Sequence, residues 1–387
     1  MLRLLLVLAV ATTLWGLIHA YMHRRLFSTW KAQGRRRRVA QAIFWFGFAL
    51  GPSTMAISRM SGGELPLAFV FPAWVWIGMA FLLFCFLVFR DVGLGAFRGV
   101  RRLMGKPLSE ERRDFLTRTT NAGVLGVTGA FTGLGLYEAL TPPELVEVDV
   151  PIAGLPAALD GYRIAQISDV HVGPTIKGGF VEHIVGRVNE LEADLVAVTG
   201  DLVDGSVAEL RQHMGAFAEL RGRDGVFFCT GNHEYYSGAL EWVEEVRRFG
   251  WTPLVNEHRV VERDGAKVLV GGCTDYSAHR MMESHRSDPA KAKEGAPECD
   301  VSLLLAHQPK SIDAAEAAGF DLQLSGHTHG GQFFPPSLFV GFAHPFHEGL
   351  GKQGDTWIYV NRGTGYWGPP IRAGVPAEIT LLRLVRA

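Results

Sequence analysis

Two histidines separated by one residue, His327 and His329, stand between glycines in the segment GHTHGGQ, directly after the apolar run FDLQL. Histidine is the commonest metal ligand among the side chains, and residues i and i+2 of an extended segment point to the same side. An extended pair of this kind is suited to bind metal. A polar turn whose histidines cap backbone groups has the same pattern, so the rest of the chain must separate these interpretations.

Similar polar clusters follow the earlier apolar runs that look like strands. Strands that are apolar on both faces are typical of α/β sheets, in which chemistry collects beyond the carboxyl ends of the strands. A single Asp or His at such a position is usually a cap or turn residue, but repetition at equivalent positions favours one shared site. The residues at these strand ends are Asp169 and His171, Asp201 and Asp204, Asn232 and His233, His307, and His327 with His329.

The donor set predicts the kind of metal. Carboxylates, imidazoles and one amide oxygen suit divalent ions of intermediate hardness such as Mn, Fe or Zn. There are too many ligands for one closed tetrahedral site, whereas two ions that share a carboxylate would use all of them. Segments with helical periodicity, such as GGFVEHIVGRVNELEA, lie between the first predicted strands and indicate βαβ crossovers. Residues 141–387 are therefore expected to form an α/β domain.

The first 140 residues have a different composition. The chain of 387 residues has a net charge of -1 and is 48% hydrophobic, with a mean hydropathy of +0.12. The apolar excess lies in runs that are each about long enough to cross a hydrocarbon core of roughly 30 Å as a helix. We expect residues 1–140 to be a helical anchor with spans at about 4–22, 39–57, 67–89 and 119–140. The first run lacks the small-residue cleavage site of a signal peptide, so an uncleaved helix is favoured.

Basic residues between the runs predict the topology. The loop before the second span contains Arg35 to Arg38, and the loop before the fourth contains Arg98, Arg101 and Arg102, whereas the loop between the second and third has Arg59 alone. Lys and Arg in short loops stay in the cytoplasm, so residues 141–387 should lie on the outer, periplasmic or extracellular, side of the inner or plasma membrane. Arginines beside a span are commonly topology determinants or lipid contacts, and no nucleic-acid partner is expected.

The segment ERRDFLTRTTNAGVLGVTGAF, which precedes and includes the fourth run, resembles a twin-arginine export signal. Its internal position weakens that interpretation, and an ordinary juxtamembrane basic pair explains it equally well.

The ordered motifs DVH, GDLVD, GNHE, a lone AH and GHTH resemble those of the calcineurin-like metallophosphoesterases. The resemblance covers Leu145 to the C-terminus. Within the family it is most similar to bacterial membrane-associated phosphodiesterases, which also have a tail like YVNRGTGYWGPPIRAGVPAEITLLRL. The resemblance implies a four-layer αββα sandwich of two mixed sheets, with a binuclear metal site at the sheet edges.

The resemblance also implies a role for each strand-end residue. Asp201 would bridge two ions, and a hydroxide shared by the ions would attack phosphorus. His233 would hydrogen-bond the phosphoryl group or protonate the leaving oxygen, as a general acid. Asp204, Glu234 and Arg362 are weaker candidates, for orienting ligands or meeting substrate. Asp169, His171 and His329 would hold the first ion, and Asn232, His307 and His327 the second.

The expected function is that of a membrane-anchored, metal-dependent phosphoesterase, with a phosphodiesterase best matching the resemblance. The substrate would be a phosphate ester, derived from lipid or the cell envelope, and membrane lipid would be a partner by proximity. Two alternatives stay open. One is a hydrolase of lipid-linked pyrophosphates at the cytoplasmic face, and the other is a non-enzymatic membrane sensor on the same fold. The sequence does not identify the leaving group or which divalent metal is used.

Overall fold

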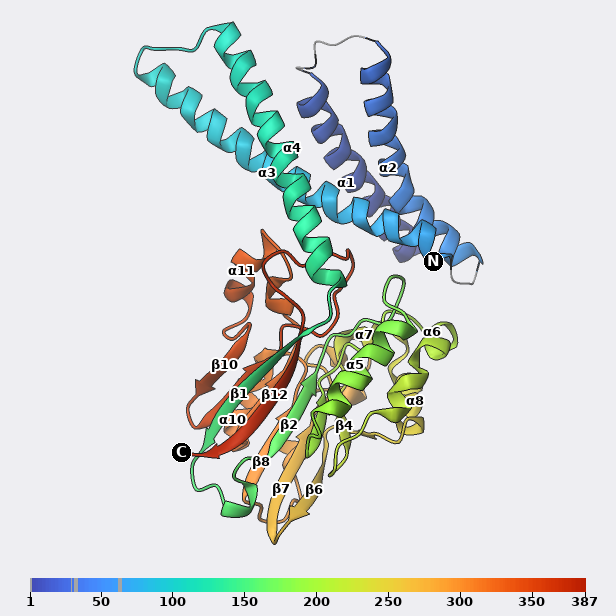
Figure 1. The fold of residues 1–387 in the computed structure, drawn as a ribbon, viewed down its shortest axis with the longest axis vertical. Coiled ribbons are helices and arrows are strands. Elements are labelled where there is room, and N and C mark those ends of the chain that lie inside the picture. The colour runs from blue at the N-terminus through green and yellow to red at the C-terminus, as the bar shows by residue number, and fades with distance from the viewer. Residues whose placement is uncertain (1, 29, 31–33, 62–64) are drawn as a thin grey trace. The chain divides into compact units, whose positions relative to one another are not determined.

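The computed structural model describes residues 2–28, 30, 34–61 and 65–387. It divides into a helical unit, residues 1–136 with 368–371, and a catalytic unit, residues 137–367 with 372–387. The division falls within a helix, between Leu136 and Tyr137, a few residues before the domain boundary expected at 140. Figure 1 shows both units, and each is described by itself.

The helical unit contains helices over all the predicted spans. They are α1 (Leu2–Phe27), α2 (Arg35–Ser61), α3 (Leu67–Leu103) and α4 (Glu110–Leu140). Buried apolar side chains hold α1, α2 and α3 together, among them Met22, Phe44 and Leu87. Among the described residues, α3 and α4 are the helices long and apolar enough to cross a membrane, by length and composition. The segments 4–22 and 39–57 are helical, and their crossing of a membrane stays a prediction.

The catalytic unit, in which every residue is described, is built on two six-stranded sheets. Sheet 1 has the order β1-β12-β2-β3-β4-β5, and β2, β3, β4 and β5 run parallel while β12 runs antiparallel to β2. Its strands are β1 (Glu144–Ile152), β2 (Arg163–Ile167), β3 (Leu195–Val198), β4 (Val226–Phe228), β5 (Thr252–Pro253) and β12 (Glu378–Arg386).

Sheet 2 has the order β10-β11-β9-β8-β7-β6, with antiparallel pairs at both edges and parallel strands between them. Both sheets are therefore mixed, as predicted. The strands are β6 (Glu257–Arg263), β7 (Ala266–Gly272), β8 (Val301–Leu305), β9 (Leu322–Ser325), β10 (Gly349–Gln353) and β11 (Thr356–Val360).

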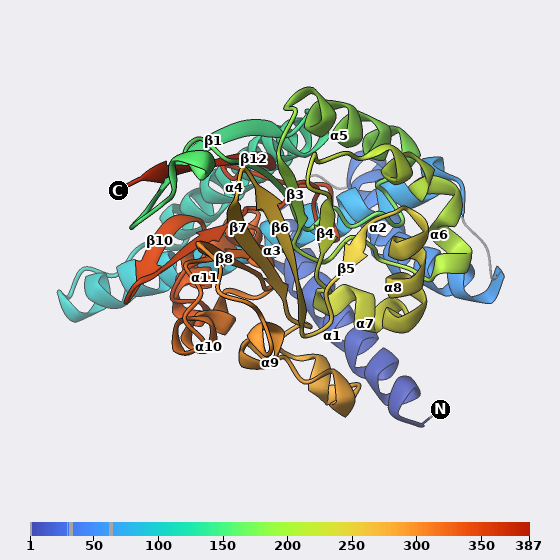
Figure 2. The ribbon, with the colours of Figure 1, turned by 90° about the horizontal axis from the view of Figure 1, so that it is seen from below.

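Side chains alternate between the two faces of each strand, so each sheet contributes to two apolar layers. Leu195 and Ala197 of β3 pack with Leu303 of β8 between the sheets, whereas Val196 and Val198 belong to the cluster under the helices. Figure 2 shows α5, α6 and α8 on one side of the sheets and α9 and α10 on the other, which is the predicted αββα order. The helices are α5 (Gly178–Glu190), α6 (Val207–Met214), α7 (Asn232–Ser237), α8 (Ala239–Arg248), α9 (Pro289–Lys293), α10 (Ile312–Ala317) and α11 (Pro336–Ala343).

Candidate metal centre

The predicted site residues follow the carboxyl ends of parallel strands in both sheets. Strand β2 ends just before Asp169, β3 before Asp201, and β4 before Asn232 in sheet 1. In sheet 2, β8 precedes His307 and β9 precedes His327. The packing of the two sheets face to face brings these loops together, although up to 160 residues separate Asp169 from His329 in the chain.

Asp169, His171 and His329 form the first ligand cluster. His329 Nε2 lies 3.2 Å from Asp169 Oδ1 and 3.1 Å from His171 Nε2. All of these side chains are buried, and their ligand atoms lie within 4.8 Å of one another. Two imidazole nitrogens that face each other at this distance beside a carboxylate have the geometry of a site for a cation.

Asp201, His307 and His327 form the second ligand cluster. His307 Nε2 lies 3.1 Å from Asp201 Oδ2 and 3.2 Å from His327 Nδ1. The same Asp201 oxygen is 4.0 Å from His171 Nε2 of the first cluster. One carboxylate oxygen is therefore near nitrogen ligands of both clusters, which is the position that a bridging ligand requires.

Asn232 supplies a test of whether this pocket fits a cation. Its side chain is buried, and Oδ1 has no hydrogen-bond partner among the described residues. An unsatisfied buried amide oxygen costs about 1–3 kcal/mol, so it needs a partner. The chain on both sides of Asn232 contacts Asp201, because the His233 N–H donates to Asp201 Oδ1 at 2.8 Å and Gly231 passes directly over the same carboxylate. The orphaned oxygen and the donor chemistry fit a divalent ion.

The backbone at the candidate ligands is strained. Non-glycine residues at positive φ are uncommon and cost of order 1–3 kcal/mol each, and they cluster at functional sites. The HxH pattern suggested an extended segment, and this prediction is wrong. The backbone is left-handed at both His327 and His329, and their rings point into different clusters. The φ angles are 53° at Asp169, 54° at His171, 50° at Asp201, 72° at His327 and 50° at His329.

Hydrogen bonds on the far side of two rings fix which nitrogen faces the ligand clusters. His171 Nδ1 lies 3.0 Å from Asp204 Oδ1, and His307 Nδ1 lies 2.7 Å from the Thr199 carbonyl oxygen. Both acceptors require the Nδ1 atom to carry the proton. Nε2 of each ring therefore faces its cluster, and this is the nitrogen that would bind a metal once its own proton is released.

Asp204 also binds His233. The same oxygen, Oδ1, lies 2.5 Å from His233 Nδ1, while His233 Nε2 lies 4.0 Å from Asp201 Oδ2. His171, Asp204 and His233 satisfy the geometric test for a third ligand group. Because one oxygen meets two Nδ1 atoms at hydrogen-bond distances, we interpret this group as a carboxylate that orients two imidazoles. His233 is thereby held with Nε2 beside the candidate metal centre.

The electrostatics differ between neighbouring groups. Burial lowers the pKa of His171, but the adjacent Asp204 carboxylate outweighs it and raises that pKa to about 9. Burial raises the pKa of Asp201, yet His307 and the other histidines bring it down to about 2. Burial, and after it the neighbouring His307, lowers the pKa of His327 to about 3. The carboxylates are therefore ionised, and His327 is neutral, as ligands need to be.

Glu234 and Arg362, the weaker candidates, contact other groups. Glu234 Oε2 accepts hydrogen bonds from the backbone N–H groups of Asp201 and Gly231, and Oε1 accepts one from Leu202. It joins the loops after β3 and β4 without meeting a candidate ligand side chain. Arg362 Nε lies 2.6 Å from Glu378 Oε2, so this guanidinium has a buried acidic partner.

Arg372 contacts the site and was missed in the sequence. The residue is fully buried, and its Nη2 lies 3.0 Å from His329 Nδ1 and 2.8 Å from the Arg362 carbonyl oxygen. Its other nitrogens donate to the carbonyl oxygens of Gly365 and Val375. Burial lowers the pKa of Arg372 to about 10, which still leaves it charged. Nothing in the segment PPIRAG distinguishes this arginine from a surface residue.

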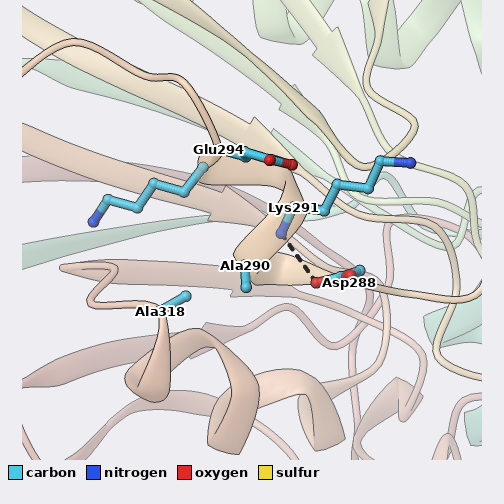
Figure 3. Close-up of a pocket in the computed structure, with 6 residues that line it drawn as sticks. Asp288, Ala290, Lys291, Glu294 and Ala318 are labelled. Carbon is cyan, nitrogen blue, oxygen red and sulfur yellow. Dashed lines mark hydrogen bonds between the residues drawn. The ribbon is translucent and has the colours of Figure 1, made fainter.

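Cavity size does not locate this site. A surface cavity of about 500 Å³ beside α9 is lined by residues that belong to no ligand cluster, and Asp288 there accepts a hydrogen bond from the Lys291 backbone (Figure 3). A second cavity, of about 340 Å³, is lined by Asp204, His233 and Tyr236 together with α6 residues. We place the site by ligand geometry, and the smaller cavity adjoins it.

Comparison with known proteins identifies the family. The profile of the calcineurin-like phosphoesterases matches residues 162–331. The Bos taurus "Transmembrane protein with metallophosphoesterase domain" is 33% identical over 335 residues, which cover 84% of this chain and 76% of that protein. This chain belongs to the calcineurin-like phosphoesterase family.

Other relatives agree with this membership. The Danio rerio protein of the same name is 37% identical over 67% of this phosphoesterase, which spans 62% of that relative's length. A metallophosphoesterase of Aquifex aeolicus is 32% identical over 66% of this chain and 95% of its own. Among solved structures, the calcineurin-like phosphoesterase YfkN from Bacillus subtilis aligns with a TM-score of 0.33 and 14% identity, over 51% of this chain and 87% of that one.

Proposed function

We propose that the protein is a membrane-anchored phosphodiesterase that uses two divalent metal ions. The observation that carries this proposal is Asp201 Oδ2, which lies near nitrogen ligands of both clusters. Asp169, His171 and His329 would hold one ion, and Asn232, His307 and His327 the other, with Asp201 between them. When bound, two such ions supply a water of lowered pKa and positive charge against the phosphoryl oxygens.

His233 is the proposed proton donor to the leaving oxygen. Asp204 Oδ1 accepts a hydrogen bond from His233 Nδ1, which fixes a proton on that nitrogen and orients the ring. Nε2 then carries the proton that the leaving alkoxide needs. His233 Nε2 lies 4.0 Å from Asp201 Oδ2, so this proton would lie beside a phosphoryl group bound at the proposed ions.

The cavity beside His233 supports a diester over a monoester. Its volume of about 340 Å³ gives room for a substituent beyond the phosphoryl group. The exposed rings of Tyr236 and Trp367 lie edge-on to His233, with centroids 5.1 and 5.8 Å away. An ester group entering this cavity would contact an aromatic surface, whereas a monoester would leave that surface in water.

The two apolar helices α3 and α4 support membrane anchoring, and so does the description of the Bos taurus and Danio rerio relatives as transmembrane proteins. The basic loops before α2 and α4 support a catalytic unit on the outer side. A reporter fused to the C-terminus tests this orientation. Activity of the reporter outside the cytoplasm is expected, and a cytoplasmic signal would favour the lipid-pyrophosphate alternative.

Hydrolysis by the purified full-length protein tests the reaction. The protein would be stripped of metal, supplied with Mn, Zn or Fe, and given a chromogenic phosphodiester and its monoester counterpart. We expect metal-dependent cleavage with preference for the diester, lost in Asp201→Asn and retained in Asp264→Asn, an exposed turn residue. Preference for the monoester would contradict the diesterase assignment, and cleavage of neither ester would contradict hydrolysis of soluble esters.

A further inference from the structure

The short helix α11, whose place in the fold is seen in Figure 1, exposes an unusual amount of apolar surface. Leu338, Phe339 and Phe342 are 60%, 57% and 88% exposed, and no residue of α11 is buried. The segment from Phe333 to Phe346 contains no Asp, Glu, Lys or Arg. Scattered apolar residues on a protein surface are normal, but a helix that presents several aromatic and aliphatic side chains together marks an interaction site.

Helix α11 is attached directly to the loop of the metal centre. The Thr328 hydroxyl, between the two histidines of GHTH, donates to the His347 carbonyl oxygen at 2.6 Å. The His344 ring at the end of α11 lies 5.4 Å from the His327 ring, centroid to centroid. At the other end, Gly331 packs against Ser337 so closely that a side chain at Gly331 would clash. The apolar helix is therefore held beside the candidate second cluster at both of its ends.

The last turn of α4 lies in the same catalytic unit. Ala139 is buried in the apolar cluster beneath α5, and Glu138 Oε2 accepts a hydrogen bond from the Gly374 N–H at 2.8 Å. Gly374 lies two residues from Arg372, which contacts His329. The exposed side chains of this turn are Tyr137, at 67%, and Leu140, at 60%. Tyrosine is enriched where a span meets the membrane surface, so a bilayer around α4 would end close to its last turn.

We propose that α11 inserts its apolar side chains into the surface of the bilayer that α3 and α4 span. A short helix with exposed Phe and Leu and no charged residue has the composition of an element that lies in the boundary between headgroups and acyl chains. Lipid is the occupant that the structure favours, because the last turn of a candidate span is built into the catalytic unit and thereby brings a membrane within reach of α11. This inference rests on the membrane anchoring proposed above.

The inference also names a substrate class. A metal centre flanked by a membrane-inserted helix meets phosphoesters at the bilayer surface. The favoured substrate is thus an amphiphilic phosphodiester with a membrane-embedded chain. A freely soluble diester would reach the same ions and His233 without using α11, and that difference separates this inference from the proposed function.

Quenching by spin-labelled lipid tests the insertion in the full-length protein, reconstituted in phosphatidylcholine and phosphatidylglycerol nanodiscs. Cys229 and Cys273 are buried, so Cys85→Ala leaves Cys299 as the accessible thiol among the described residues. Cys299 precedes β8, at the end opposite His307, and serves as the matched control. An environment-sensitive fluorophore would be attached either there or at Leu338→Cys with Cys299→Ser. The lipids would carry nitroxides on their acyl chains.

We expect the label at position 338 to emit at shorter wavelength and to be quenched several-fold more than the label at 299. Equal quenching at both positions would overturn the inference. A blue-shifted label at 338 that lipid nitroxides do not quench would also overturn it, because α11 would then be covered by protein, either the helical unit or a second copy. Neither readout depends on catalysis.

Activity gives a second test. The double variant Phe339→Ser/Phe342→Ser would be compared with wild type on a chromogenic diester in solution and on a phosphodiester embedded in the nanodisc. We expect the ratio of the two rates to shift by about tenfold against the embedded substrate, since two membrane anchors are lost. An unchanged ratio would contradict the substrate class. If wild type cleaves neither substrate, the proposed function fails while the quenching result stands.

Discussion

The loops of the two sheets contribute different chemistry to one site. Sheet 1 provides the carboxylates Asp169, Asp201 and Asp204, and sheet 2 provides imidazoles. Burial lowers the pKa of His329, in sheet 2, to about 4 despite the contact with Asp169, whereas Asp204 raises the pKa of His171 in sheet 1 to about 9. The carboxylates therefore lie on sheet 1, and His327 and His329 of sheet 2 are neutral. His307 of sheet 2 differs, because the Asp201 carboxylate outweighs burial and raises the pKa of that ring well above its ordinary value.

Each ligand cluster takes residues from both sheets. His329 of sheet 2 completes the cluster of Asp169 and His171, and His307 and His327 of sheet 2 meet Asp201 of sheet 1. Binding of two ions would thus join the edges of the sheets, and neither sheet holds a complete site. The following predictions test the division of roles, from the largest expected effect to the smallest.

Removal of the shared carboxylate should affect both ions. In Asp201→Asn we expect kcat to fall by roughly a thousandfold or more and less than one ion to be retained, because the oxygen near both clusters loses its charge. His327→Gln, in sheet 2, should lose the second ion alone. Elemental analysis of the purified proteins measures both effects. Two ions per chain in Asp201→Asn would contradict the bridging role.

Removal of the proposed proton donor should lower the reaction rate without changing the amount of bound metal. We expect His233→Ala to lower kcat by about 10²- to 10⁴-fold with metal content unchanged, because the ring meets Asp204 and not a ligand cluster. Steady-state rates and elemental analysis check this together. The exposed His183→Ala, on α5, is the matched control. Loss of an ion from His233→Ala would instead identify His233 as a ligand.

Arg372→Gln should weaken the first cluster selectively. The guanidinium contacts His329 and the backbone of the loop around Gly365, so its loss should lower the affinity for one ion by about 10- to 100-fold. Competition with a chromophoric chelator measures this affinity, and Arg372→Lys should recover part of it. Arg383→Gln, which breaks an exposed pair with Asp149, is the control. Equal metal affinities in Arg372→Gln, Arg372→Lys and Arg383→Gln would show that Arg372 only packs against the loop.

The stability of metal-stripped protein should fall as pH rises. The pKa of His171 in the folded state is about 9, above the ordinary value of 6.5. A group with a raised folded pKa stabilises the fold below its unfolded pKa, and this contribution is lost as pH rises through the folded pKa. We expect a loss of about 3 kcal/mol between pH 6.5 and 9. The raised pKa of Glu234, about 7 against an ordinary 4.5, acts in the same direction but mainly between pH 4.5 and 7.

Thermal unfolding of the stripped protein across this range measures the loss. Asp204→Asn, which removes the main cause of the His171 shift, should flatten the dependence. A wild-type midpoint that does not fall between pH 6.5 and 9 would contradict the charge assigned to sheet 1.

Local pattern was sufficient for much of the fold. The apolar runs predicted β2, β3, β4, β8 and β9, because strands buried on both faces need continuous apolar sequence. The residues after these strands lie close together in the structure, since parallel strands end at one edge. Asn232 joined them, although asparagine at a strand end is ordinarily a turn residue. Their roles as ligands stay predictions until metal binding is measured.

Tertiary contacts decided what pattern did not contain. Arg372 is ordinary in sequence and becomes notable through burial and its contact with His329. The segment that forms α11 has the apolar composition of a buried helix. Only its exposure, together with the Thr328 contact to His347, makes it a candidate membrane surface.

The sequence by itself determined the family, the α/β class and the identity of the strand-end residues, because each depends on local composition, periodicity and spacing. The tertiary structure decided which histidine joins which carboxylate, that Asp204 serves both His171 and His233, and that α11 stays uncovered. These depend on how two sheets pack and on left-handed backbone at Asp169, Asp201 and His327, which long-range contacts impose and no local propensity favours.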